Sequence, residues 1–111
     1  MTEYEINKAV ADKFLPCDYM YNDESQVVEF VVIRNVNNFG IDEEVAIPYG
    51  VFDPCNNAQQ AWEIIYNFKI DISFGDDVHP ALKGCTMAIK GDKSITSNKP
   101  FVAAMLLFLE I

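Results

Sequence analysis

The first fourteen residues carry apolar side chains at helical spacing. Four of them recur every three or four positions: Ile6, Ala9, Val10 and Phe14. Thr2 and Glu5 have the spacing of a capping box, in which each side chain binds a backbone amide at the helix start. The pattern predicts a helix from Glu3 to Phe14 that ends before Pro16.

A second helical pattern lies in the middle of the chain and contains the only tryptophan. Its apolar stripe consists of Ala58, Ala61, Trp62, Ile65 and Tyr66. Two helix starts are compatible with it. Asp53 can cap the first amides ahead of Pro54, or Asn57 can be the N-cap with Gln60 three residues further on. We expect the helix to stop at Asn67.

Residues 68–74 change to a period of two, with apolar side chains at 68, 70, 72 and 74. This alternation predicts a strand with one buried and one solvated face. A strand so close to a helix should fold back, so that Trp62 and Ile65 cover its apolar face. Burial of a side chain such as Trp62 contributes roughly 1.5–3 kcal/mol, so we expect the tryptophan in the core.

Three further segments have the composition of strands. Residues 26–36 are dense in β-branched side chains on both faces, which is typical of an interior strand or of one that is covered on both faces. Residues 35–40 form a turn cluster, and residues 43–47 would complete a hairpin that ends at Pro48. Residues 85–90 alternate between apolar and polar side chains and predict a fourth strand.

The last eleven residues, 101–111, are apolar on nearly every side, with Glu110 as their only charge. Such a helix cannot stay half in water, so it lies within the fold or forms a subunit interface. The second alternative is a homodimer through the C-terminal helix. Ser97 or Asn98 can cap this helix, with Pro100 near its start.

These elements predict an α+β fold in the order αββαββα. We expect one domain over residues 1–111. Its small four-stranded sheet, antiparallel or mixed, would be packed by three helices.

The charge is strongly acidic and unevenly distributed. The formal net charge is −9; residues 1–50 hold ten acids and three bases (−7), and residues 51–111 hold seven acids and five bases (−2). This balance argues against direct nucleic-acid binding. The acidic half is a solvated surface, or it meets a basic partner.

The cysteines at 17, 55 and 85 are odd in number and far apart, which suits free thiols in a reducing cytoplasm. Charges interrupt residues 1–15, so no signal peptide is expected. The longest apolar run is far shorter than the ~20 residues of a membrane span. We therefore expect a cytoplasmic protein without a membrane partner.

Candidate chemistry is confined to the turn before the central helix. Asn56 and Asn57, beside the turn at Asp53 and Pro54, suit capping; alternatively, the helix amides and these Asn side chains form a small anion or peptide-terminus site. Cys55 is a buried, inert thiol, or one whose pKa the helix start lowers. The ligand-binding hypothesis rests on four residues: Asp53, Cys55, Asn56 and Asn57.

No other constellation in the sequence indicates catalysis. A phosphate loop is absent, and the single histidine, His79, lies near no nucleophile turn. Asp76 and Asp77 precede it, but adjacent acids on a loop rarely converge on one ion. We predict no catalytic residue, no metal and no cofactor.

Two separated segments resemble the NinX-like family of small proteins from lambdoid phages and enterobacterial prophages. The first holds Cys55, Asn56, Asn57, Ala61, Trp62, Ile64, Ile65, Ile70 and Ile72. The second holds Asn98, Pro100, Phe101, Ala103, Ala104 and Met105. The function of that family is uncharacterised, so the resemblance implies a cytoplasmic, phage-derived accessory role and lends no catalytic residue.

Two functional hypotheses follow. The first is a non-enzymatic module that binds a host or phage protein. The second is a small-molecule-binding protein or enzyme that uses the turn at residues 53–57.

Overall fold

The structure is a computed structural model that describes residues 1–74 and 84–111. Within these residues the elements follow one another in the order αβββαβββα. Their bounds are α1 (Glu3–Phe14), β1 (Tyr19–Asn22), β2 (Val27–Asn38), β3 (Ile41–Phe52), α2 (Ala58–Phe68), β4 (Asp71–Phe74), β5 (Thr86–Lys90), β6 (Lys93–Ser97) and α3 (Pro100–Glu110).

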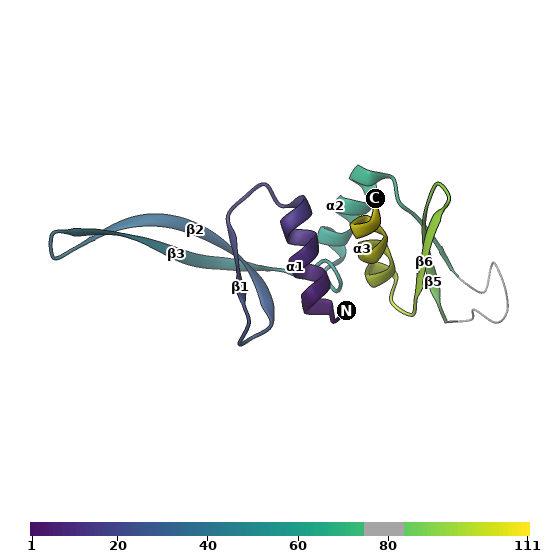
Figure 1. The fold of residues 1–111 in the computed structure, drawn as a ribbon, viewed down its shortest axis with the longest axis horizontal. Helices are drawn as coiled ribbons and strands as arrows, with labels where there is room; N and C mark the ends of the chain where they lie inside the picture. Colours follow the sequence, from purple (N-terminus) through teal and green to yellow (C-terminus); the bar gives the residue numbers. More distant parts are fainter. Residues whose placement is uncertain (75–83) are drawn as a thin grey trace.

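The described strands form two antiparallel three-stranded sheets, ordered β1-β2-β3 and β4-β5-β6. The three helices lie between the sheets (Figure 1). The α+β class and the three helices are confirmed, whereas the single four-stranded sheet and the order αββαββα are wrong. The two strands that the sequence pattern missed are β1, with only four residues, and β6, in which Ile95 is the sole apolar side chain.

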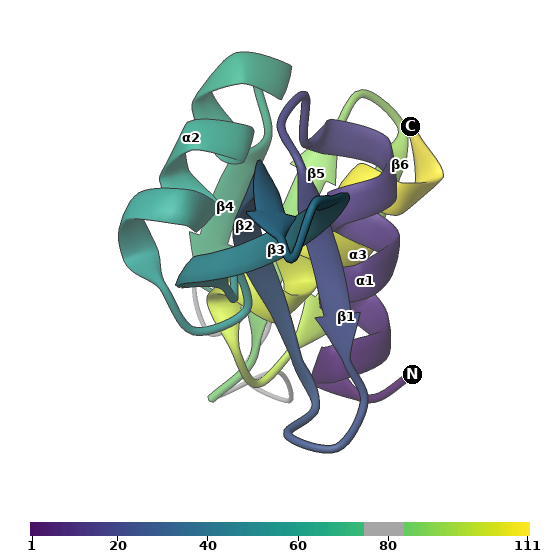
Figure 2. The same cartoon turned by 90° about the vertical axis from the view of Figure 1, so that its left-hand side faces the viewer.

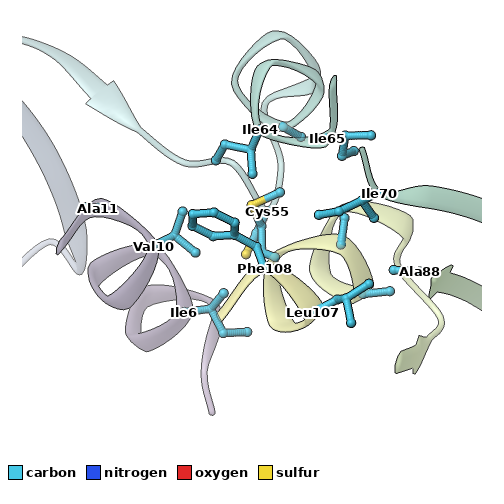
Figure 3. Packing of buried hydrophobic residues seen from close by; sticks show 14 of the residues in the cluster. Ile6, Val10, Ala11, Cys55, Ile64, Ile65, Ile70, Ala88, Leu107 and Phe108 are labelled. Atoms are coloured by element: carbon cyan, nitrogen blue, oxygen red, sulfur yellow. The ribbon is translucent and has the colours of Figure 1, made fainter. Parts of the chain in front are cut away.

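The core is formed where the helices meet (Figure 3). α1 and α2 contribute Ile6, Val10, Ile64 and Ile65, and α3 contributes Ala103, Ala104, Met105, Leu107 and Phe108. Phe108 packs against Phe68 with ring centroids 4.7 Å apart. The C-terminal helix therefore lies within the fold, and its remaining apolar side chains, Phe101, Val102, Leu106 and Leu109, are partly buried.

The central helix begins at the second of the two predicted starts. Asn57 is its N-cap, and its side chain accepts a hydrogen bond from the Gln60 amide. The helix runs one residue past the expected stop, to Phe68, and Lys69 ends it in the left-handed region at φ 57°. The predicted strand at residues 68–74 accordingly begins only at Asp71.

Trp62 is not a core residue. It is 43% exposed, because the buried face of α2 is made by Ala61, Ile64 and Ile65. The expected burial of Trp62 is therefore wrong, whereas Ile65, expected beside it, is buried in the same core cluster as Ile70. The indole packs instead against Tyr66 and Phe101, with centroids 5.8 and 6.4 Å apart.

The β2–β3 hairpin projects far from the helices (Figure 1), and Figure 2 looks down onto its tip. The hairpin makes the molecule 67 Å long and 26 Å wide, with a radius of gyration of 17.5 Å, against about 13 Å for a compact chain of this length. Pro48 does not end β3 as predicted. A register shift lies between Phe30 and Val31, and this bulge lets β3 continue to Phe52, since proline is tolerated on an edge strand.

No helix in the described part of the chain has both the length and the apolar composition to cross a membrane.

Candidate functional site

The turn before α2 joins three parts of the fold. Asp53 accepts hydrogen bonds from the side-chain amide of Asn7 at 2.8 Å and from that of Asn56 at 3.1 Å. Asn56 also donates to Glu3, 2.7 Å away. Gln60 accepts from the Asp53 amide at 2.7 Å. These contacts fix the end of β3 against α1 and the start of α2.

A cavity of about 350 Å³ opens beside this turn. Its walls come from α1, from the start of β2 and from the end of β3. The polar groups that line it include Glu3, Asn7, Asp53 and Asn56. Asn7 is 94% buried, and its Oδ1 has no hydrogen-bond partner among the described residues. A buried oxygen without a partner is costly, and Asn7 is one of the residues that line the cavity.

Of the four predicted ligand-binding residues, only Asp53 and Asn56 line this cavity. Asn57 caps α2, the role that its position in the sequence favoured. Cys55 is buried, with 3% exposure. Burial, together with the nearby carboxylates of Glu3 and Asp53, raises the pKa of the Cys55 thiol to about 12. The thiol is therefore protonated near neutral pH and poorly nucleophilic, so its hypothetical activation by the helix start is not realised.

Glu3 links this turn to the start of α3. Its carboxylate lies 2.6 Å from the ammonium of Lys99, the N-cap residue of α3. The hydrogen bonds from Lys99 and Asn56 lower the pKa of Glu3 below its ordinary value. Because Lys99 occupies the N-cap position, the predicted caps, Ser97 and Asn98, do not act as N-caps. The Lys99 side chain itself makes no hydrogen bond to the helix amides.

The second candidate surface lies on the β2–β3 hairpin. β1 pairs with β2 only as far as Phe30. Beyond the next pair of β2 and β3, Val31 and Pro48, residues 32–47 form a two-stranded ribbon, which we call the arm. Six apolar side chains of its two strands are 38–63% exposed: Val32, Ile33, Val36, Ile41, Val45 and Ile47. An isolated two-stranded ribbon is marginally stable in water, so a ribbon with this apolar surface is typical of a binding element.

The strand register divides the arm into two different faces. Directly opposed residues share a face, and successive residues alternate between faces. One face, here called the apolar face, carries the pairs Val32–Ile47, Arg34–Val45, Val36–Glu43 and Asn38–Ile41. The other, called the acidic face, carries Ile33–Ala46, Asn35–Glu44 and Asn37–Asp42. Toward its tip the arm is therefore amphipathic.

Phe39 stands at the tip of the arm and is 99% exposed. It forms the two-residue turn with Gly40, and both have positive φ, 54° and 81°. That conformation is normal for Gly and Asn but uncommon for a bulky aromatic residue. A strained, solvent-exposed aromatic residue contributes little to the stability of the monomer, and it is the type of side chain that anchors protein contacts.

Sequence reasoning missed the arm because it ended the hairpin too early. Residues 26–36 have apolar side chains on both faces, a pattern that predicts an interior strand, and β2 is indeed the central strand of its sheet, but only as far as Phe30. The available signal was the pair Phe39 and Gly40 between two β-branched runs, which is a hairpin turn with an unusual aromatic residue.

The metal ligands considered in the sequence, Asp76, Asp77 and His79, lie outside the described residues. Residues 1–74 and 84–111 contain no cluster of three or more His, Cys, Asp or Glu side chains placed to hold a metal ion.

Comparison of the chain with models of known families, with curated proteins and with solved structures finds no match.

Proposed function

We propose that this chain is a non-enzymatic protein-binding module, and that the arm is the element with which it binds. The observation that carries the proposal is the exposure of apolar side chains along residues 32–47, together with Phe39 at the tip. Such a surface is expected to be covered by another protein chain. The resemblance to the NinX-like family supports an accessory role in a phage or prophage, with a host or phage protein as partner.

The acidic face suits a basic partner. Asp42 and Glu44 lie on it without a basic side chain between them, and the chain as a whole carries a net charge of −9. Complementary charge steers association and favours basic surfaces over acidic ones. This arrangement is unfavourable for nucleic acid, so the expected partner is a protein.

A shortened arm tests the proposal without disturbing the core. Val32 and Ile47 are directly opposed, so residues 33–46 can be replaced by an Asn-Gly turn. Both chains are immobilised and exposed to an enterobacterial lysate at several salt concentrations. The intact chain should retain a saturable partner that the shortened chain loses. Equal retention by the two chains would contradict the proposal.

Two matched variants refine the test. Asp42→Asn with Glu44→Gln removes the charge of the acidic face, and it should weaken capture, most strongly at low salt. Tyr66→Ser removes an aromatic side chain that is 75% exposed on α2, away from the arm, and it should leave capture unchanged.

The cavity beside Asp53 favours a second candidate, a small-molecule-binding protein. The unpartnered Oδ1 of Asn7 and the carboxylates of Glu3 and Asp53 would accept hydrogen bonds from a donor-rich ligand. A thermal-shift screen of nucleotides and metabolites tests it. A ligand that raises the melting temperature of the intact chain but not of Asn56→Ala would favour this candidate over the first.

A further inference from the structure

We infer that the apolar face of the arm binds the same face of a second copy of this chain, in an antiparallel arrangement of the two arms. The inference deepens the proposed function, on which it rests, because it identifies one of the protein chains that the arm binds. The acidic face then points away from the pair and stays available to a partner of another kind.

The apolar face continues the face of β2 that packs in the core. Val28 is fully buried, and it is paired with Phe52, which is 2% exposed. Phe30 follows on the same face and packs against the core. The pattern then runs outward through Val32 and its partner Ile47, which are 41% and 43% exposed. The sequence thus keeps this face of β2 apolar beyond the point where the monomer buries it.

The charges on this face are self-complementary. Arg34 and Glu43 are its only charged residues, and they occupy adjacent rows, Arg34 opposite Val45 and Glu43 opposite Val36. Among the described residues, Arg34 has no carboxylate within 4.0 Å. A face with one charge of each sign suits a copy of itself, whereas a basic partner would be matched by the acidic face.

A two-fold axis between these two rows satisfies both charges at once. It brings Arg34 of each chain level with Glu43 of the other, as an isologous contact requires. The same operation brings each Phe39 tip toward the base of the other arm. There Tyr49, 62% exposed, stacks on Phe30 with centroids 5.9 Å apart. The exposed aromatic at the tip thereby meets an aromatic pair.

The antiparallel arrangement also limits the electrostatic cost of pairing two acidic chains. The arms lead away from the helices (Figure 1), so the two bodies lie at opposite ends of the pair. At physiological ionic strength, charges separated by more than about 8 Å are largely screened. Edge-to-edge pairing through β3 is disfavoured instead, because its free edge carries Pro48 and three consecutive acids, residues 42–44.

Charge exchange across the two-fold axis tests this dimer. Sedimentation velocity of the intact chain, from low micromolar to near-millimolar concentration, measures the dissociation constant. Arg34→Glu and Glu43→Arg each place like charges across the interface, and each should weaken the dimer about tenfold or more. The double variant restores opposite charges and should recover the affinity of the intact chain. Glu44→Arg makes the same substitution on the acidic face and should leave the dimer intact.

Four results would overturn the inference. Three of them are a chain that is monomeric at every concentration, a Glu44→Arg variant weakened as much as Glu43→Arg, and a double variant that does not recover. Dimers that survive both single variants point to pairing through strand edges and also overturn it. A monomeric chain that captures a lysate protein through its arm refutes the dimer and leaves the proposed function standing. A dimer that captures no other protein supports this inference and counts against a host or phage protein as partner.

Discussion

Val28 and Val32 lie on the same face of β2, yet Val28 is fully buried and Val32 is 41% exposed. The difference arises because Val28 belongs to the core cluster and Val32 does not, while the apolar pattern continues outward. The arm therefore has the apolar pattern of a core strand but lies outside the core. The proposed binding role and the dimer both follow from this continuity.

The two phenylalanines Phe108 and Phe39 provide a matched test of the core. Phe108 is fully buried and packs edge-on against Phe14 and Phe68. Phe108→Ala should lower the free energy of unfolding by about 3–5 kcal/mol. Phe39→Ala removes the same atoms from a 99% exposed site and should change it by less than about 0.5 kcal/mol, measured at concentrations where the chain is monomeric. Urea denaturation gives both values, and equal losses would contradict the core described here.

Two asparagines test the helix caps. The Asn57 side chain accepts from the Gln60 amide at 3.0 Å and caps α2, so Asn57→Ala should lower the free energy of unfolding by about 1 kcal/mol. Asn98 precedes α3 without capping it, so Asn98→Ala should have little effect. Thermal unfolding of both variants makes the comparison. A larger loss at Asn98 would mean that α3 begins differently.

Two cysteines should differ sharply in their reactivity. Cys17 is exposed and Cys55 is buried, and burial raises the pKa of the Cys55 thiol to about 12. An aromatic disulfide reagent near neutral pH should therefore react readily with Cys17, and with Cys55 only after denaturation. Mass spectrometry of the labelled chain locates the modification. Labelling of native Cys55 at a rate comparable to that of Cys17 would contradict its burial and would support a reactive thiol at this position.

Asp12 should stabilise the fold in a pH-dependent manner. The hydroxyls of Tyr21 and Tyr19 hydrogen bond to it and lower its pKa below the ordinary 3.8. A carboxyl group whose pKa is lower in the folded chain contributes stability above its unfolded pKa, and that stability is lost as the pH falls through the folded pKa. Asp12→Asn should therefore melt below the wild type near neutral pH, and the difference should shrink below about pH 4. A difference that grows on acidification would refute this.

Local signals in the sequence predicted the helices well. The Thr2 and Glu5 capping box, the Asn57 cap and the apolar α3 all depend on neighbouring residues, and the structure has each of them. The number of sheets could not be predicted in the same way, because strand pairing depends on contacts between distant residues. β6, with only Ile95 as an apolar side chain, becomes a strand by pairing with β5.

The positions of individual side chains were harder to predict than the elements. Trp62 shares its apolar stripe with Ile65, and only the packing of α2 determines which of them is buried. Of the four residues predicted to bind a ligand, Asp53 and Asn56 line a cavity, whereas Asn7, whose Oδ1 has no partner in the described part of the chain, comes from α1, a distant segment. Sequence periodicity carries no information on which distant element completes a pocket.

The central claim is that a second copy covers the apolar face of the arm, and the molar mass in solution tests it most directly. Light scattering after size exclusion should give twice 12.6 kDa for the intact chain at high concentration. The chain in which Asn-Gly replaces residues 33–46 should remain a monomer under the same conditions. A monomeric mass for both chains, or a dimeric mass for both, would contradict the claim.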